Sequence, residues 1–493
     1  MSRHENQKLI IAVVYVAAMF MAIMDTTIVN VALPAIGRDF HSQAESVGLV
    51  SIAYLVSLAV FIPASAWLGD RLGGRRALLG SLAVFTIGSA LCGLCTTLGE
   101  LVAFRVLQGA GGAIMTPVGL ALLFRVYPPA ERVRVSSILA LVTGLAPALG
   151  PVLGGVFTTY VSWRLAFFVN VPIGVAAFLF GALWLNDHAQ PRTAHLDIPG
   201  FVLSALGLGC AMYGVSEGPT QGWSSSPVLI TIIAGLTLLV ALVAVELRAR
   251  NPLIALRLFT NRLFAGSTGL YALGSVAYLG GLYLAALFFQ DALGQSAVQA
   301  GLLTFPAALG TIVGGQIVTR FLYWRFGPRR IVAVGFLLVA ATMGLMAQVT
   351  LTTGLWLVGL IMFGLGLGIS MVFISAQAAS MATITTAQTG QASAIYNAAK
   401  QLGGSIGVAL LTTVLAAAVP ASHAARNLTG FHDGFLTAAA VALGAVAVAL
   451  TIRDADAAST MIQRQPRRTA NRAKEPGPRR HERPRHPTTL HRS

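Results

Sequence analysis

Apolar stretches of 18 or more residues recur along almost the whole chain, and they constrain its fold more than any other feature. Each stretch is long enough to cross a bilayer core of about 30 Å as an α-helix. A chain with only 10% charged residues and a mean hydropathy of +0.75 would expose large apolar patches in water. The sequence therefore predicts an all-α polytopic membrane protein. Its fourteen predicted spans are 9–34, 47–69, 77–97, 101–124, 136–160, 165–186, 199–216, 228–246, 262–290, 299–320, 330–350, 354–376, 391–418 and 434–452.

The basic residues predict how these spans are oriented. The first apolar run is too long for a signal peptide, so it is taken as a helix. With the N-terminus inside, seventeen Lys and Arg fall in cytoplasmic segments before the tail, whereas only Arg38, Arg164 and Arg426 fall in external loops. This asymmetry places the N-terminus in the cytoplasm, and an even number of spans returns the C-terminus there. Most of the net charge of +16 thus reflects the basic residues that orient the spans, and it does not indicate nucleic-acid binding.

A short motif occurs twice and predicts an internal repeat. The spacing Arg-x-Gly-x-Arg-Arg follows the second span at Arg71–Arg76 and the tenth span at Arg325–Arg330. We therefore expect two six-helix bundles, 9–186 and 262–452, with an inserted helix pair at 199–246. Residues 453–493 hold eleven Lys and Arg and few apolar residues, so they are predicted to form a disordered cytoplasmic tail. That tail is either simply solvated or in contact with anionic lipid.

Six local motifs, in this order along residues 9–452, resemble the major facilitator superfamily and specifically its fourteen-helix drug:proton antiporters. They are Asp25–Pro34 in the first span, Leu68–Arg76 in the loop after the second, Arg105–Gly112 in the fourth, Gly150–Gly155 in the fifth, Trp163–Gly174 around the start of the sixth and Tyr396–Gly404 in the thirteenth. The sequence departs from the loop signature in two places. Ala66 stands where the signature usually has Gly, and Trp324 replaces the Asp in the second copy.

Two of these motifs are candidates for conformational change. The resemblance implies that Asp70 meets a helix terminus or a basic partner in the other half and releases it as the halves rock. Gly73 permits a tight turn there, while Arg71, Arg75 and Arg76 hold the turn inside the cell. The alternative is a simple topology anchor. In the fifth span, Gly150, Pro151, Gly154 and Gly155 resemble a motif associated with exchange and hence with export. The alternative for these residues is ordinary small-residue helix packing.

Asp25 is the only Asp or Glu predicted to lie well inside a span, where a carboxylate costs at least a few kcal/mol. Arg105 lies at a comparable depth in the fourth span. We therefore predict that Arg105 approaches Asp25 and controls its protonation, so that the two residues couple transport to protons. In the alternative interpretation, Arg105 only snorkels outward.

Four further polar side chains are candidate substrate contacts: Asn30, Gln108, Asn397 and Lys400. Lys400 lies near mid-membrane and needs a partner or an aqueous cavity, so it contacts either substrate or backbone carbonyls. The amides serve equally well in helix–helix hydrogen bonds. With one deep carboxylate and two deep cations, the expected substrates are neutral or weakly anionic molecules, or cations that compete for Asp25.

The sequence as a whole predicts a proton-coupled antiporter that exports amphipathic, drug-like small molecules across the bacterial inner membrane, acting as a monomer in the lipid bilayer. A proton-coupled importer or facilitative carrier of a specific metabolite is the alternative. An enzyme or an ATP-driven pump is not expected, because no nucleotide-binding loop or nucleophile–base constellation appears. No cofactor or metal is expected either, since Cys92, Cys95 and Cys210 form no ligand framework.

Overall fold

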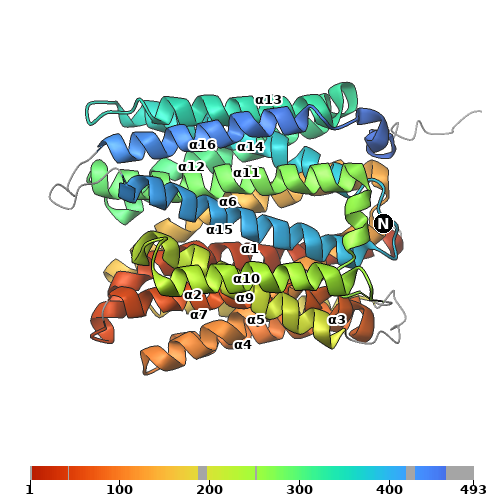
Figure 1. Ribbon diagram of the computed structural model, residues 1–493, viewed down its shortest axis with the longest axis horizontal. Helices are drawn as coiled ribbons and strands as arrows, with labels where there is room; N and C mark the ends of the chain where they lie inside the picture. Colours follow the sequence, from red (N-terminus) through yellow and green to blue (C-terminus); the bar gives the residue numbers. More distant parts are fainter. Residues whose placement is uncertain (1–2, 43, 187–196, 250–251, 418–427, 462–493) are drawn as a thin grey trace, which may run out of the picture. The chain divides into compact units, whose positions relative to one another are not determined.

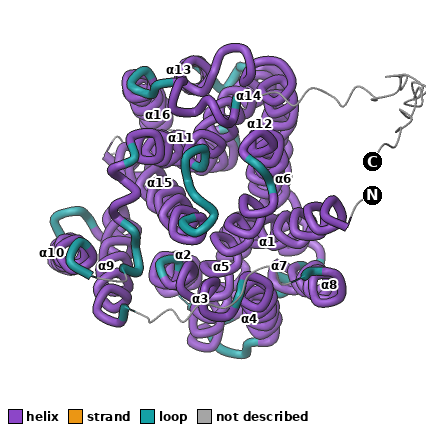
Figure 2. Tube along the Cα trace, turned by 90° about the vertical axis from the view of Figure 1, so that its right-hand side faces the viewer, coloured by secondary structure: helices purple, strands orange, loops and turns teal. Residues whose placement is uncertain are grey.

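The helices of the computed structural model lie side by side along one common direction (Figure 1), and Figure 2 views them from one end. The structure describes residues 3–461 except 43, 187–196, 250–251 and 418–427. Within these ranges it contains sixteen α-helices and no β-strand. The predicted all-α class is confirmed.

The region predicted to hold the first six spans contains eight of these helices. Helices α2 and α3 meet at a 60° bend next to Pro63, which cannot donate a helical hydrogen bond and therefore bends the span. The single turn α7 leads directly into α8. The bounds are α1 Arg3–Asp39, α2 Ala44–Phe61, α3 Ala64–Leu72, α4 Gly74–Leu94, α5 Leu98–Val126, α6 Arg132–Tyr160, α7 Leu165–Phe168 and α8 Asn170–Trp184.

The remaining eight helices comprise the inserted pair and the last six spans. Helices α11 and α12 each continue into a short π-helical segment, Phe288–Ala292 and Val318–Leu322 respectively. The bounds are α9 Ile198–Gln221, α10 Ser226–Glu246, α11 Arg262–Leu287, α12 Ala297–Ile317, α13 Tyr323–Met346, α14 Leu355–Ser380, α15 Thr389–Ala417 and α16 Leu428–Ala449.

The number of spans agrees with the prediction once two bent regions are considered. Twelve helical runs among the described residues are long and apolar enough to cross a membrane, and the bent pair α2–α3 makes a thirteenth. One of the twelve, Val298–Met346, is 49 residues long and joins α12 to α13. Gly327 interrupts it with non-helical backbone, so this run supplies two spans rather than one. The described chain therefore contains the fourteen predicted spans.

The two Arg-x-Gly-x-Arg-Arg turns share an unusual backbone conformation. Gly73, between α3 and α4, has φ 82° and ψ 146°, and Gly327, near the start of α13, has φ 71° and ψ 167°. A positive φ is unfavourable for residues with a Cβ atom, which explains why both copies place glycine here. The repeat visible in the sequence is thus also a repeat of backbone structure at these two turns.

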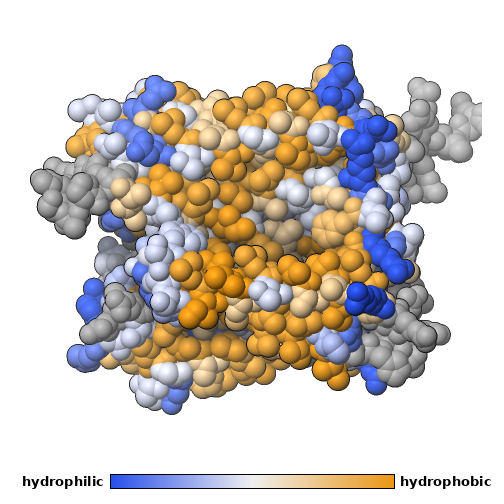
Figure 3. Space-filling view, viewed as in Figure 1, coloured by the Kyte–Doolittle hydropathy of each residue, from blue (hydrophilic) through white to orange (hydrophobic). Residues whose placement is uncertain are grey.

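The surface is apolar around the middle of the helices and hydrophilic toward their ends (Figure 3). On α10, for example, Ile230, Ile233 and Val240 are 65%, 61% and 71% exposed. Such side chains would be a liability in water but face hydrocarbon in a bilayer. Hydrophilic residues are densest at the end that holds the N-terminus, on the right in Figure 3, which we call the basic end.

The inserted helix pair lies beside helices from both predicted halves. Helix α9 packs against α10, and also against α2 and α15 (Figure 2). An apolar cluster of Ala59, Leu208 and Met212, with Leu402 against it, joins α2, α9 and α15. The inserted pair is therefore anchored along the boundary between the first six and the last six spans.

The folded chain extends beyond residue 453, where the tail was predicted to begin. Residues Asp454–Thr460 form a 3-10 helix in which Ala457 and Thr460 are completely buried. The Thr460 hydroxyl lies 2.8 Å from that of Tyr323, and the Ser459 hydroxyl donates to the Ala382 carbonyl at 3.2 Å. The described fold therefore includes residues 454–461, which the prediction assigned to the tail. The rest of the predicted tail, 462–493, and most of the linker before α9, 187–196, lie outside the described residues.

Candidate functional site

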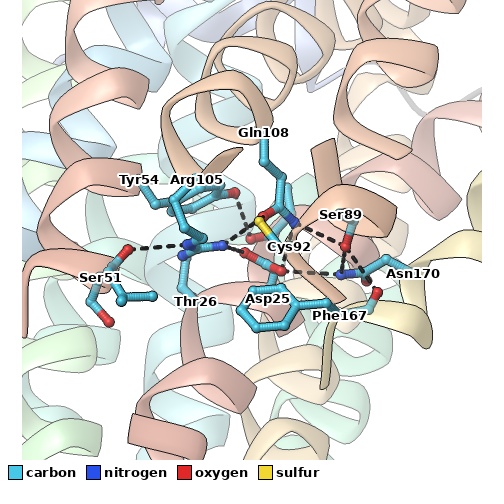
Figure 4. A network of polar contacts seen from close by, with 12 residues as sticks. Asp25, Thr26, Ser51, Tyr54, Ser89, Cys92, Arg105, Gln108, Phe167 and Asn170 are labelled. Atoms are coloured by element: carbon cyan, nitrogen blue, oxygen red, sulfur yellow. Dashed lines mark hydrogen bonds and ion pairs between the residues drawn. The ribbon is translucent and has the colours of Figure 1, made fainter. Parts of the chain in front are cut away.

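A network of buried polar side chains surrounds Asp25 in the middle of α1 (Figure 4). Asp25 is completely buried, and its Oδ2 accepts a hydrogen bond from Arg105 Nη1 at 2.5 Å. Its Oδ1 accepts from Gln108 Nε2 at 2.8 Å and from Asn170 Nδ2 at 3.1 Å. Both carboxylate oxygens are therefore occupied, which is the arrangement that an ionised carboxylate needs inside an apolar bundle.

Arg105 on α5 points into the bundle rather than toward its surface. The residue is 1% exposed, and its Nε donates to the Val50 carbonyl at 3.1 Å. Its Nη1 also donates to Gln108 Oε1 at 2.8 Å, and the guanidinium carbon lies 4.0 Å from the centre of the Tyr54 ring. The cation is thus supported by a carboxylate, two carbonyl oxygens and an aromatic face.

Ser89 on α4 supports the two amides that hold Asp25. Its hydroxyl accepts from Gln108 Nε2 at 3.2 Å and from Asn170 Nδ2 at 3.1 Å, and it donates to the Phe167 carbonyl at 2.9 Å. The network therefore includes side chains from α1, α4, α5 and α8. A change at Asp25 therefore acts directly on α5 and α8, and through Ser89 on α4.

The glycines of α6 bring that helix against α1 close to Asp25. A Cβ atom added to Gly150 would overlap the Thr27 side chain and lie 3.0 Å from the Ile28 nitrogen. One added to Gly154 would lie 3.0 Å from the Ile28 carbonyl oxygen. The predicted conformational motif thus packs within one helical turn of Asp25, and Pro151 lies inside the same helix. Gly155 is also buried in α6.

Asp70 pairs with a basic residue of its own half. Its Oδ1 lies 3.3 Å from Arg125 Nη2 on α5, whereas the resemblance had implied a partner in the other half. The other half is nevertheless close: a Cβ atom on Gly390, at the start of α15, would lie 3.6 Å from Arg125 Nη2 and 3.9 Å from Ala66. The same turn is fixed to α8 by Arg75, whose Nη2 donates to the Ala182 carbonyl at 2.6 Å. Arg71 and Arg76 are exposed.

At the second copy of the turn, a carboxylate from elsewhere in the chain takes the place next to the glycine. Trp324, which replaces the Asp, donates its indole N–H to the Thr319 carbonyl at 2.6 Å. Asp454, from the segment after α16, accepts from the Arg329 backbone nitrogen at 2.9 Å. A carboxylate at a helix N-terminus satisfies an unpaired N–H group and interacts favourably with the helix dipole.

Replacing Asp454 by Ala is expected to lower the free energy of unfolding by about 1 kcal/mol, because the part of α13 that begins after Gly327 loses its cap. The effect is measured as a lower apparent melting temperature of the purified protein. Asp456→Ala is the matched control, since Asp456 carries the same charge two residues away and is exposed. An equal loss in both variants would contradict a capping role for Asp454.

The four candidate substrate residues lie in different surroundings. Gln108 belongs entirely to the Asp25 network, and Asn397 is buried, with its amide donating to the Ser393 carbonyl at 2.9 Å. Asn30 is exposed and accepts from the Ser51 hydroxyl at 2.9 Å. Lys400 is partly buried and has no hydrogen bond or ion pair with any residue that the structure describes. Asn30 and Lys400 therefore remain the more accessible pair.

The cysteines belong to helix packing in this structure. Cys92 Sγ lies 3.8 Å from Gln108 Oε1, and Cys95 Sγ donates to the Cys92 carbonyl at 3.1 Å. All three cysteines are free thiols. Among the described residues, no group of three or more His, Cys, Asp or Glu side chains could hold a metal ion.

Three members of the network were not predicted as site residues: Ser89, Asn170 and Tyr54. Asn170 offered a signal, because it is an amide inside an apolar run. Buried amides in membrane helices need partners, so this residue could have been included. Ser89 and Tyr54 carried no comparable signal, since both residue types are ordinary in membrane helices.

Fourteen membrane spans, an internal repeat and a buried ion pair between the first and fourth spans define a polytopic carrier of the facilitator type. Comparison with known protein families supports this class. The Major Facilitator Superfamily matches residues 15–408. The chain belongs to this superfamily and is therefore a multi-pass membrane transporter.

Its relatives include proteins of drug resistance. The chain is 35% identical over 408 residues to a multidrug resistance protein B homolog of Mycobacterium tuberculosis, covering 82% of this chain and 75% of the relative. It is 32% identical over 439 residues to the tetracenomycin C resistance and export protein of Streptomyces glaucescens, covering 88% and 81%. A crystal structure of the human organic anion transporter MFSD10 has the same fold, with a TM-score of 0.63, 14% identity and coverage of 91% and 100%. The predicted resemblance to the drug:proton antiporter family is confirmed.

Proposed function

We propose that this transporter is a proton-coupled antiporter that exports amphipathic small molecules across the bacterial plasma membrane, with its basic end and both termini in the cytoplasm. The observation that carries the proposal is the buried ion pair of Asp25 and Arg105 at 2.5 Å. An intramembrane carboxylate is expensive and is typical of proton and ion pathways. The names of the relatives support export of drug-like molecules as the associated transport activity.

Proton binding at Asp25 changes the charge balance of the whole polar network. Protonation neutralises the carboxylate and leaves Arg105 as a buried cation without its counter-ion. Removing one partner of a buried ion pair costs about 3–5 kcal/mol, which is more than the remaining carbonyl contacts of Arg105 readily offset. We therefore expect the guanidinium to move when Asp25 is protonated, and α1 and α5 to shift relative to one another.

The neighbouring contacts offer a route from this local shift to a change of access. Gly150 and Gly154 bring α6 against α1 beside Asp25, so α6 moves with α1. At the basic end, Arg132 at the start of α6 donates to the Met381 carbonyl just after α14. A movement of α6 therefore affects a contact between the first six and last six spans. In the described state this contact links α6 to the segment after α14 at the basic end.

The energy available from one proton is sufficient for concentrative export. One elementary charge that crosses 100 mV contributes about 2.3 kcal/mol, and exchange for a drug molecule couples that energy to outward movement. The substrate lies between two apolar bundles, where amphipathic molecules are accommodated. Asn30 and Lys400 are the proposed polar contacts, and Asp70 with the turns at Gly73 belongs to the gating contacts.

The direction of drug movement under an imposed proton gradient tests this function. In proteoliposomes with the purified chain, acidification of the compartment facing the external end is expected to drive drug accumulation in that compartment. A protonophore should abolish the accumulation. If drug and protons move in the same direction, the protein is a proton-coupled importer. If drug moves only down its own gradient and ignores the proton gradient, it is a facilitative carrier.

A further inference from the structure

Lys400 is a cation near the middle of a span that lacks a partner among the described residues. It lies eleven residues beyond the start of α15, about 16 Å along the helix axis. Arg105, the other deep cation, has a carboxylate, two carbonyl oxygens and an aromatic ring around it. An ammonium group at this depth requires a counter-charge or an aqueous space. The structure supplies a counter-charge for Arg105 and leaves Lys400 without one.

The face of α15 that carries Lys400 is turned toward the interior of the protein. Gly403 and Gly407, one and two turns further on, lie against the backbone of α11: added Cβ atoms would meet the carbonyls of Ala272 and Val276. Leu402 lies on a different face, against α2 and α9. Because residues four apart lie on the same face of a helix, Lys400 is directly above Tyr396.

Tyr396 belongs to an aromatic cluster to which both predicted halves contribute. Its ring centre lies 4.3 Å from that of Tyr271 on α11, and Tyr271 is stacked on Phe373 of α14 at 4.4 Å. Tyr15 of α1 belongs to the same buried core as these three rings. These four rings, which we call the tyrosine cluster, are at most 4% exposed. They form an aromatic floor about 6 Å from Lys400 along the axis of α15.

The charge of this region differs from that around Asp25. Both oxygens of the Asp25 carboxylate are engaged by Arg105, Gln108 and Asn170, so that carboxylate does not neutralise a second cation. The region around Lys400 therefore has a net positive charge. An anionic ligand group there would gain a charge-assisted hydrogen bond and would reduce the cost of burying the ammonium group.

We propose that Lys400 and the tyrosine cluster form a subsite for an aromatic anion, so that the substrates include molecules with a carboxylate, sulfonate or phenolate attached to a ring system. The ammonium group binds the anion, and the rings of Tyr396 and Tyr271 pack against the aromatic part of the substrate. This inference rests on the proposed transport function. It identifies the charge class of the substrate, which the transport direction alone does not.

A matched pair of fluorescent probes tests the subsite. 1-Anilinonaphthalene-8-sulfonate and N-phenyl-1-naphthylamine share the same ring system and differ by one sulfonate group. Binding of each probe to the purified full-length protein is measured in detergent without a proton gradient. Lys400→Met is expected to weaken sulfonate binding about tenfold, the effect of losing one charge-assisted hydrogen bond, and to leave binding of the uncharged amine within about twofold.

Two further variants separate charge from packing. Lys400→Arg keeps the cation and is expected to retain binding of the sulfonate. Tyr396→Leu removes one ring of the tyrosine cluster and is expected to weaken binding of both probes to a similar degree. Equal effects of Lys400→Met on both probes, or no effect on either, would overturn the anion subsite.

The same probes distinguish this proposal from the proposed antiport. If the uncharged amine is exported with a proton gradient and Lys400→Met does not change sulfonate binding, only the subsite is wrong. If wild-type protein binds the sulfonate through Lys400 but moves no probe or drug in response to a proton gradient, the subsite stands and the antiport proposal fails.

Discussion

Asp25→Asn is expected to abolish proton-driven accumulation of drug, because asparagine cannot carry the transported proton. A proton that crosses 100 mV contributes about 2.3 kcal/mol, so loss of a single coupled proton should lower the attainable concentration ratio by about 50-fold. The measurement is drug accumulation in proteoliposomes at a fixed membrane potential and pH difference. Downhill movement of drug, measured in the absence of both gradients, is expected to continue.

A second variant separates the loss of coupling from a loss of stability. Asp25→Asn leaves Arg105 as an uncompensated buried cation, and removing one partner of such a pair costs about 3–5 kcal/mol. In the double variant Asp25→Asn with Arg105→Met, the unpaired cation is also removed, so the melting temperature should recover while proton coupling does not. If Asp25→Asn retains wild-type accumulation, Asp25 is not the proton carrier.

Gly150→Val is expected to reduce transport at least about tenfold, because the valine side chain has no room between α6 and α1. An added Cβ atom alone would overlap Thr27 and lie 3.0 Å from the Ile28 nitrogen. Insertion of extra atoms into a packed interface costs about 1–3 kcal/mol and displaces the backbone. The displacement occurs within one turn of Asp25, so both the transport rate and the coupling of transport to protons should decrease.

Gly80→Val is the matched control for this substitution. Gly80 also lies inside a membrane helix, α4, but it is exposed and an added Cβ atom would meet nothing within 4 Å. Both variants lose the same backbone freedom, and only Gly150→Val disturbs a helix contact. Transport and melting temperature are measured for both proteins. A similar loss of transport at Gly80 would show that the contact with α1 is not the cause.

The depth of a residue within its membrane span could be predicted from the sequence. The residues that lie beside it on other helices could not. The rise per residue of a helix placed Asp25 and Arg105 at similar depths, and the structure brings them to 2.5 Å. Whether α4 and α8 also reach this point depends on helix packing, which the apolar pattern of each span does not specify. Ser89 and Asn170 were missed for that reason.

The repeated turn and the segment after α16 show the same limit of prediction from sequence. Two glycines at the same motif position indicated two turns with the same backbone conformation, because a positive φ is a local requirement of the backbone. The role of Asp454 could not be predicted in this way, since its partner Arg329 is 125 residues away in the sequence. Composition assigned the segment after residue 453 to the tail, whereas tertiary contacts with Tyr323 and Ala382 fold its first residues.

The cap that Asp454 provides has a consequence for biosynthesis. A ribosome makes α13 well before it makes residue 454, so the nascent chain inserts this helix with an uncapped start. Asp454 then reaches that position only when all of the described membrane helices have been made. The contact of Asp454 with Arg329 thus marks a chain whose described membrane helices have all been made, and a product arrested before residue 454 lacks it.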